Sequence, residues 1–174
     1  MAVLMDQFRL AYDGPPDLSP RYNIAPTQDI AAVRMLDGRR QFSMLHWGLI
    51  PSWAKDPKIG NSLLNARAET VAEKPSFRSA FKSRRCLILA DGYYEWLKVG
   101  KAKQPYLYEI EAGKPCALAG LWESWQGMQS CTIIATEAND LASAVHDRMP
   151  VILDEVDYDA WLDPAQQDRD TLTR

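Results

Sequence analysis

The chain contains 174 residues, the size of one ordinary domain, and 47% of them are hydrophobic, which is enough to form a core. Its formal net charge is −3, so the overall charge gives no argument for nucleic-acid binding, although Arg84 and Arg85 are adjacent and lysines cluster at 98, 101 and 103. No apolar run is long enough to span a membrane, and the first residues turn acidic too soon for a signal peptide.

The cysteines and histidines argue against disulfides and metal sites. Cys86, Cys116 and Cys131 are odd in number, widely spaced and set among apolar residues, which predicts reduced, buried thiols typical of a cytosolic protein. His46 and His146 have no ligand-like partners nearby in sequence, so we expect no zinc site, and we expect no cofactor.

The first half of the chain predicts one helix and several strands. Residues 4–12 are amphipathic and end at Gly14-Pro15-Pro16, which predicts a short helix. Residues 29–36 and 41–47 predict strands around Asp37-Gly38, a hairpin signal. Prolines and glycine make 48–63 irregular, and 64–70 is expected to be extended.

The second half continues mostly as strands. We expect strands at 85–90, 93–98, 104–110, 116–122, 130–136 and 150–153, with a hairpin across Gly100, and helices at 75–82, 139–146 and 156–162. Because the helices are interspersed irregularly, this order predicts an α+β fold rather than alternating βαβ units. No repeat or interdomain linker divides the chain, so we expect a single domain.

Three short polar motifs stand out against apolar surroundings. They are Asn-Ala-Arg-Ala-Glu-Thr at 65–70, Ala-Asp-Gly-Tyr-Tyr-Glu-Trp at 90–96 and His-Asp-Arg-Met-Pro at 146–150. Burying such groups unpaired would cost several kcal/mol, so a core has no use for them. The motifs therefore predict one polar site assembled from three distant segments.

Three residues in these motifs have side chains suited to catalysis. In an extended segment, Asn65 shares a face with Arg67 and Glu69 and could hold a substrate oxygen or polarise a carbonyl. Glu95 lies between aromatic residues that would raise its pKa toward the range of a general acid or base, and His146 could shuttle protons. Each also has a purely structural interpretation. Asn65 could bond to neighbouring backbone groups, Glu95 could be an exposed carboxylate on a hairpin, and His146 could have a structural role.

Other residues suggest a ligand or a different chemistry. Arg148 beside His146 suggests an anion such as phosphate. Trp47 and Trp53 flank an irregular segment and could stack on exposed bases, although packing is the simpler explanation for each. A cysteine hydrolase built on Cys86 is a third hypothesis, weakened because no motif surrounds that residue.

Six motifs together resemble the SOS-response-associated peptidase (SRAP) family of abasic-site processing proteins. Besides the three polar motifs, they are Arg-Tyr-Asn-Ile-Ala-Pro-Thr-Gln at 21–28, His-Trp-Gly-Leu-Ile-Pro-Ser-Trp-Ala at 46–54 and Ser-Phe-Arg-Ser-Ala-Phe at 76–81. They occur in the family's order between about residues 18 and 162.

The resemblance implies a fold and an activity. The expected fold is a single α+β domain over residues 1–174, with a curved, barrel-like, mostly antiparallel sheet and a few peripheral helices. The implied protein is a monomeric, cytoplasmic, bacterial DNA-damage (SOS) protein that joins the nucleoid when acting, with self-processing peptidase (hydrolase, protease) and lyase-type activity. It binds single-stranded DNA and cross-links to abasic sites through an N-terminal cysteine, whose amine forms a Schiff base and whose thiol closes a thiazolidine ring.

The resemblance also assigns roles to residues. Asn65 would position the N-terminal cysteine or the sugar, Glu95 would be the acid/base that opens the deoxyribose, and His146 would assist proton transfer and crosslink reversal. The implied DNA-binding residues are the phosphate-holding Arg67 and Arg148, the stacking Trp47 and Trp53, and the basic pair Arg84 and Arg85.

The chain departs from the family at both ends. The family begins Met-Cys-Gly-Arg, whereas this chain begins Met-Ala-Val-Leu-Met-Asp, and it stops before a further family strand, so we expect the domain to be incomplete at both ends. A misassigned start, a trimmed fragment and a shortened paralogue are competing explanations. The alternative function is a relative that binds single-stranded DNA without crosslinking. A smaller departure is Leu89, where family members often have proline.

This departure gives a first prediction. An N-terminal Met or Ala amine can form only a reversible imine with the sugar aldehyde, so the polypeptide of this sequence should form no heat-stable adduct with abasic single-stranded DNA. Denaturing gel electrophoresis after heating checks this, and a shifted band that survives heating would contradict it.

Overall fold

The computed structural model describes residues 2–10, 19–110, 114–168 and 172. Strands dominate, and the helices are short, so the predicted α+β class is confirmed. The strands are β1 (Asp29–Leu36), β2 (Arg39–Trp47), β3 (Asn65–Arg67), β4 (Arg85–Ala90), β5 (Gly92–Val99), β6 (Ala102–Glu109), β7 (Cys116–Trp125), β8 (Met128–Glu137), β9 (Arg148–Pro150) and β10 (Ile152–Leu153). The helices are α1 (Ala2–Gln7), α2 (Arg78–Ser83), α3 (Asp140–Ser143) and α4 (Tyr158–Leu162), with 3₁₀ turns at Pro57–Ser62 and Glu155–Asp157.

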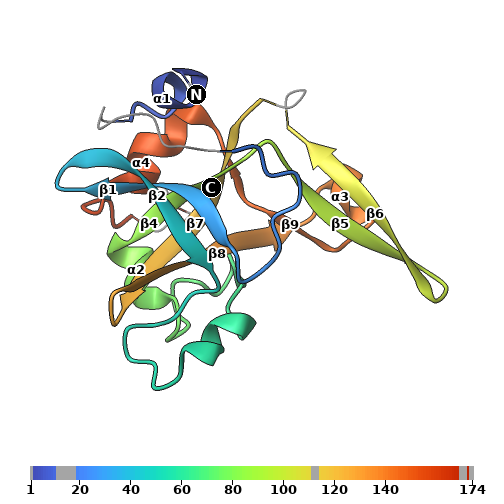
Figure 1. The fold of residues 1–174 in the computed structure, drawn as a ribbon, viewed down its shortest axis with the longest axis horizontal. Coiled ribbons are helices and arrows are strands. Elements are labelled where there is room, and N and C mark those ends of the chain that lie inside the picture. Colours follow the sequence, from blue (N-terminus) through green and yellow to red (C-terminus); the bar gives the residue numbers. More distant parts are fainter. Residues whose placement is uncertain (1, 11–18, 111–113, 169–171, 173–174) are drawn as a thin grey trace.

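Five strands close into a ring. The sheet runs β7–β4–β1–β2–β8, and β7 also pairs with β8, which joins the two ends (Figure 1). All of these pairings are antiparallel except that of β8 with β2. The predicted turn at Asp37-Gly38 connects β1 to β2, and its two positive φ angles, 50° and 72°, are those of the hairpin turn that suits twisted strands.

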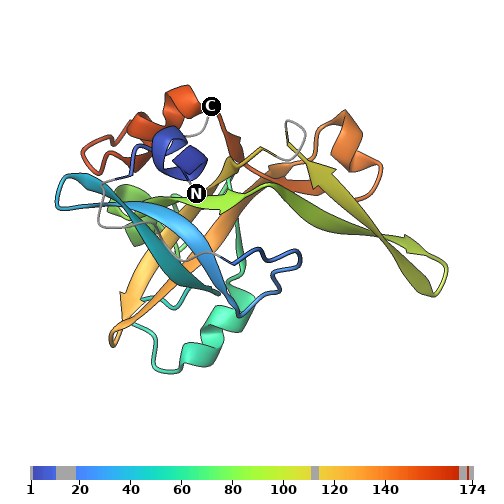
Figure 2. The same ribbon diagram turned by 45° about the horizontal axis from the view of Figure 1, so that its top comes forward.

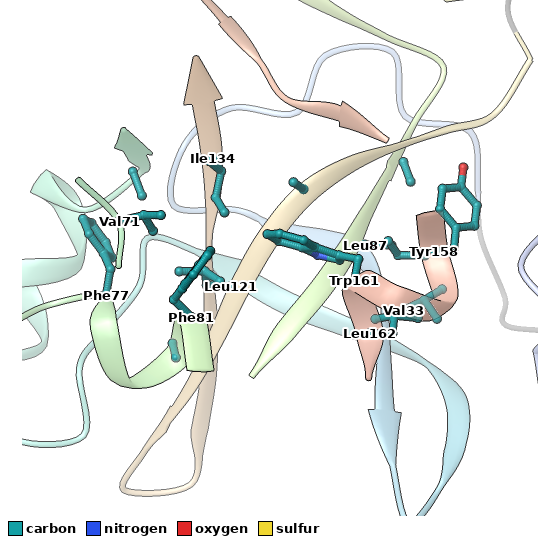
Figure 3. Packing of buried hydrophobic residues seen from close by; sticks show 14 of the residues in the cluster. Val33, Val71, Phe77, Phe81, Leu87, Leu121, Ile134, Tyr158, Trp161 and Leu162 are labelled. Carbon is teal, nitrogen blue, oxygen red and sulfur yellow. The ribbon is translucent and has the colours of Figure 1, made fainter. Parts of the chain in front are cut away.

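Side chains alternate between the inside and the outside of the ring wall. The inner cluster contains Ile30, Ala32, Leu45, Cys86, Ile88, Cys116, Leu118, Cys131 and Ile133. The outer cluster is covered by α1, α2 and α4, and Figure 3 shows Phe81 and Trp161 turned toward one another, with 6.2 Å between ring centroids. Phe8, which follows α1, stacks on Tyr158 of α4. Figure 2 shows the two helices side by side.

One arginine lies inside the ring. Arg34 is 4% exposed, and its guanidinium carbon lies 4.4 Å from the centroid of the Trp122 ring. Its Nε donates to Ser43 Oγ at 3.0 Å, whereas its Nη1 has no partner among the described residues. Burial lowers the pKa of Arg34.

The β5–β6 hairpin forms a separate sheet that projects from the ring (Figures 1 and 2). Its strands pair from Gly92 opposite Glu109 to Val99 opposite Ala102. The hairpin predicted across Gly100 is therefore confirmed.

Several predicted elements are shorter in the structure. The helix expected at 4–12 is α1, which ends at Gln7, and residues 11–12 lie outside the described part of the chain. The extended segment expected at 64–70 ends at Arg67, because residues 68–74 turn. The helix expected at 139–146 contains only α3, which Asn139 caps by accepting a hydrogen bond from the Ala142 N–H at 2.9 Å.

A glycine inside the ring makes a testable packing prediction. A Cβ at Gly120 would lie 2.7 Å from Ile88 Cγ1 and 3.0 Å from Cys86 Sγ. Gly120→Ala should therefore cost about 1–3 kcal/mol of unfolding free energy by overpacking. Ile88→Ala removes the closest atoms, so the double variant should lose less than the sum of the two single variants in denaturant titrations. Additive losses would contradict this account.

Candidate functional site

The end of β8 gathers two of the three polar motifs. On one edge of β8, β3 runs parallel with Arg67 opposite Ala135; on the other edge, β9 runs antiparallel with Pro150 opposite Ala135 and Arg148 opposite Glu137. β3 and β9, which are distant in sequence, therefore lie on either side of the same strand. The structure brings the 65–70 motif and the 146–150 motif to the same rim of the sheet.

The position of Asn65 is fixed by the carbonyl that precedes it. The Leu64 carbonyl accepts hydrogen bonds from Trp47 Nε1 at 3.0 Å, from Thr132 Oγ1 at 3.0 Å and from the Ile133 N–H at 3.1 Å. Ala66 is buried, so alternation leaves Asn65 and Arg67 exposed on the other face. Among the described residues, no hydrogen bond is formed by the side chain of either, and both are open to a ligand.

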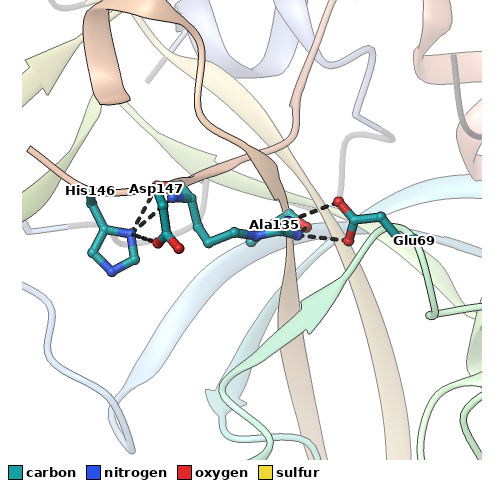
Figure 4. Close-up of polar contacts among 5 residues, drawn as sticks. Glu69, Ala135, His146 and Asp147 are labelled. Carbon is teal, nitrogen blue, oxygen red and sulfur yellow. Dashed lines mark hydrogen bonds and ion pairs between the residues drawn. The ribbon is translucent and has the colours of Figure 1, made fainter. Parts of the chain in front are cut away.

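Glu69 and Arg148 form a two-point ion pair. Arg148 Nη1 donates to Glu69 Oε1 at 2.8 Å and Arg148 Nη2 donates to Glu69 Oε2 at 2.9 Å, while Nη2 also donates to the Ala135 carbonyl (Figure 4). These hydrogen bonds lower the pKa of Glu69 and raise the pKa of Arg148. The phosphate-binding residue predicted at 148 is thus already bound to a carboxylate.

His146 is oriented through one of its ring nitrogens. The backbone N–H of Arg148 donates to His146 Nδ1 at 3.0 Å, and Asp147 Oδ1 and the Arg148 carbonyl oxygen each lie 3.3 Å from the same nitrogen (Figure 4). In the tautomer in which Nδ1 accepts this shortest contact, the neutral ring carries its proton on Nε2. The side chain is 46% exposed, so that N–H can reach a ligand.

Glu95 joins this group from the projecting hairpin. It is half-buried on β5, and burial raises its pKa; a charge on the nearby His146 acts in the opposite direction, and Asp147 adds to the rise. The carboxylate is therefore close enough to the 146–147 segment to feel its charges. Tyr106 lies directly opposite Glu95 on β6.

Arg85, which was predicted to bind DNA, is buried and bonded within the protein. Its side chain is 3% exposed, and its guanidinium donates to backbone carbonyls of Phe81, Lys82, Trp161, Asp163 and Gln166. Arg85 instead ties α2 and α4 to β4. Its neighbour Arg84 forms an ion pair with Glu123 at 2.7 Å, at the end of the ring where β8 begins and thus away from the polar rim.

The two predicted stacking tryptophans differ. Trp47 is partly buried, packs against the inner cluster and binds the Leu64 carbonyl, so its role in the structure is to anchor the start of β3. Trp53 is 57% exposed on the irregular segment. Tyr94 and Trp96, the aromatic neighbours that were expected to raise the pKa of Glu95, alternate with it and so occupy the opposite face of the hairpin, where both are exposed.

The three cysteines are free and buried. Cys86 is fully buried, and burial raises its pKa, as it also raises the pKa of Cys116 to about 11. The cysteine-hydrolase hypothesis is therefore wrong for Cys86, because a nucleophilic thiol needs access and a lowered pKa. Within the described residues there is no cluster of three or more potential metal ligands and no helix suited to crossing a membrane.

Comparison with known proteins finds a matching family and relatives that share most of this chain's length. The family described as SOS response associated peptidase (SRAP) matches residues 2–174. Abasic site processing protein YoqW of Bacillus subtilis is 42% identical over 176 residues, which cover 97% of this chain and 79% of YoqW. Abasic site processing protein HMCES of Xenopus tropicalis is 33% identical, covering 87% of this chain and 56% of HMCES.

Solved structures agree with this relationship. A Bacteroides thetaiotaomicron protein superposes with a TM-score of 0.77 at 29% identity, covering 84% of this chain and 68% of that one. A Bordetella bronchiseptica protein also gives 0.77 at 26% identity, covering 92% and 83%. On the family match over nearly all of its length and on its identity to YoqW, this chain belongs to the SRAP family.

Proposed function

We propose that this chain is an abasic-site processing protein that binds single-stranded DNA and transfers protons at the opened sugar. The observation that carries the proposal is that a half-buried Glu95 and the ring of His146, contributed by separate segments of the fold, lie close enough for the charge of His146 to act on Glu95. Such a pair suits ring opening, in which one proton leaves the sugar hydroxyl and another reaches the ring oxygen. The names of YoqW and HMCES support the same substrate.

Glu95 is the proposed acid/base. Its raised pKa keeps the carboxyl protonated to a higher pH than an ordinary glutamate, so it can protonate the departing oxygen. His146 would donate a hydrogen bond through Nε2, and Asn65 would hold the sugar or an attacking amine. Amine attack on the aldehyde and loss of water then give an imine.

The proposed covalent linkage needs an N-terminal cysteine. Addition of its thiol to the imine carbon, with the thiol proton passing to nitrogen, closes the thiazolidine, and only an N-terminal cysteine has amine and thiol on adjacent carbons. Cys86, Cys116 and Cys131 are internal and buried, so they cannot replace it. Self-processing peptidase activity in the SOS response would use the same cysteine. A chain lacking it would bind the lesion without crosslinking, which is the second candidate function.

DNA would lie along the polar rim. Arg67 is the proposed phosphate-binding residue, because it is exposed and its guanidinium forms no hydrogen bond among the described residues. Trp53 stays the proposed stacking residue, but it lies away from this rim, at the end of the ring where β8 begins, because its neighbours Ser52 and Ala54 bond to Glu123 and Trp125. Arg148 contributes less to phosphate binding, because three of its N–H groups already go to Glu69 and Ala135.

Binding is tested with fluorescent oligonucleotides that carry a tetrahydrofuran in place of the abasic sugar. Single-stranded oligonucleotides should bind more tightly than duplexes, and Arg67→Ala should weaken binding and flatten its salt dependence by about 0.7 in slope for one lost phosphate contact. Arg39→Ala is the matched control, because Arg39 is exposed at the distant β1–β2 turn. Equal effects of the two variants, or equal affinity for duplex, would count against the proposal.

The role of Glu95 gives a prediction on pH. Trapping of the imine with borohydride should fall about 100-fold or more in Glu95→Gln, with DNA affinity unchanged. Because burial raises the pKa of Glu95 and the acid form donates the proton, the Glu95-dependent rate should fall as pH rises through that pKa. In Glu95→Gln, the trapping rate should not show this fall with rising pH. An unchanged profile would reject Glu95 as the acid.

A further inference from the structure

The position of Glu69 is unexpected, because a negative charge lies on a rim that is proposed to bind the negatively charged DNA backbone. Glu69 lies just beyond β3, faces the proposed DNA path and would repel phosphate. Its carboxylate nevertheless binds Arg148 with two nearly equal hydrogen bonds, 2.8 and 2.9 Å. Such two-point geometry fixes the plane of the guanidinium as well as its position.

The guanidinium of Arg148 is held on a second side. Nη2 donates to the Ala135 carbonyl, on the β8 residue that lies between β3 and β9. The Nε atom is buried and has no partner among the described residues. From β9, the side chain thus reaches across β8 to the residue that follows the end of β3, and it is held there by Ala135 and Glu69.

The backbone of the same residue orients the imidazole. The Arg148 N–H donates to His146 Nδ1 at 3.0 Å. Any shift of Arg148 therefore moves the group that sets which ring nitrogen carries the proton. Arg148 connects Glu69 with His146 through its side chain on one side and its main chain on the other.

We propose that Glu69 is a positioning residue that acts through Arg148 to hold the His146 ring with Nδ1 as acceptor and Nε2–H facing the ligand. The functional meaning of that orientation rests on the proposed function, whereas the orientation itself does not. This role explains why a carboxylate lies on the rim that is proposed to face DNA: it holds Arg148 in place, and Arg148 in turn orients His146.

The alternative is that Arg148 serves DNA and Glu69 merely competes for it. The two accounts make different predictions for the protein in the absence of DNA. Positioning requires the His146 ring and the Arg148 amide to change when Glu69 is altered, whereas competition requires no change at either group.

The test uses NMR of the whole chain with Glu69→Gln. Gln keeps the shape of Glu69 and removes the charge that holds the guanidinium. Exchange of the Arg148 amide proton should become about tenfold faster or more, because its local structure opens more readily. The Nδ1 and Nε2 resonances of neutral His146 should move toward one another as both tautomers become populated. His46, the only other histidine, is the internal reference.

Glu137→Gln is the matched control. Glu137 lies opposite Arg148 on β8, raises the pKa of Arg148 by its charge, and forms no hydrogen bond with it. Arg148→Lys is a second variant, which keeps the charge and removes the two-point contact, and it should reproduce the effect of Glu69→Gln. Unchanged Arg148 exchange and His146 resonances in Glu69→Gln, or equal changes in Glu137→Gln, would overturn the proposal.

Imine trapping separates this proposal from the proposed function. If both hold, Glu69→Gln lowers the trapping rate and Glu137→Gln does not. If wild-type protein traps no imine, the proposed function fails, and the NMR measurements still decide whether Glu69 orients His146.

Discussion

Hydrogen bonding along both edges of a single strand, β8, is the constraint on which the rest of the structure depends. One edge pairs first with β2 and then with β3, and the other pairs first with β7 and then with β9. The first pairings close the ring and enclose the inner cluster. The second pairings begin where the ring ends, so the strand that completes the core also carries two polar segments beyond it.

The charges on this rim alternate in sign. The charge of Arg67 lowers the pKa of Glu69, and Glu69 binds Arg148. The charges of Asp147 and His146 shift the pKa of Glu95 in opposite directions. Hydrogen bonding to Arg148 lowers the pKa of Glu69, which is half-exposed, whereas burial outweighs the charge of His146 and raises the pKa of Glu95. The pKa values of the two glutamates therefore shift in opposite directions, that of Glu69 mainly through a partner and that of Glu95 mainly through loss of solvent.

Local pattern predicted much of this architecture from sequence. Alternation in Asn65-Ala66-Arg67 correctly placed the alanine inside, and Asp37-Gly38 located the first turn. Local pattern could not separate Arg84 from Arg85, because the carbonyls that bury Arg85 come largely from α4 and the residues after it, more than 70 positions away.

The same limit applies to the site. The polar face of residues 65–69 was visible in the sequence, but the pairing of Glu69 with Arg148 spans 79 positions and depends on where β8 places both. For Trp47, packing was the simpler expectation, but its partner, the Leu64 carbonyl, is a backbone group 17 positions away that no side-chain pattern indicates. Side chains whose roles are set by distant backbone groups lie beyond what periodicity can resolve.

The β5–β6 hairpin has a mechanical consequence. Its two strands pair with each other, and β-ladder bonds to the ring are absent among the described residues. Glu95 and His146 therefore sit on two separately braced bodies, joined by chain connections and side-chain contacts. A different angle between the hairpin and the ring would change the burial of Glu95 and its separation from His146 without breaking a ladder bond. Because burial is what raises the pKa of Glu95, the way the hairpin is set against the ring also sets that pKa.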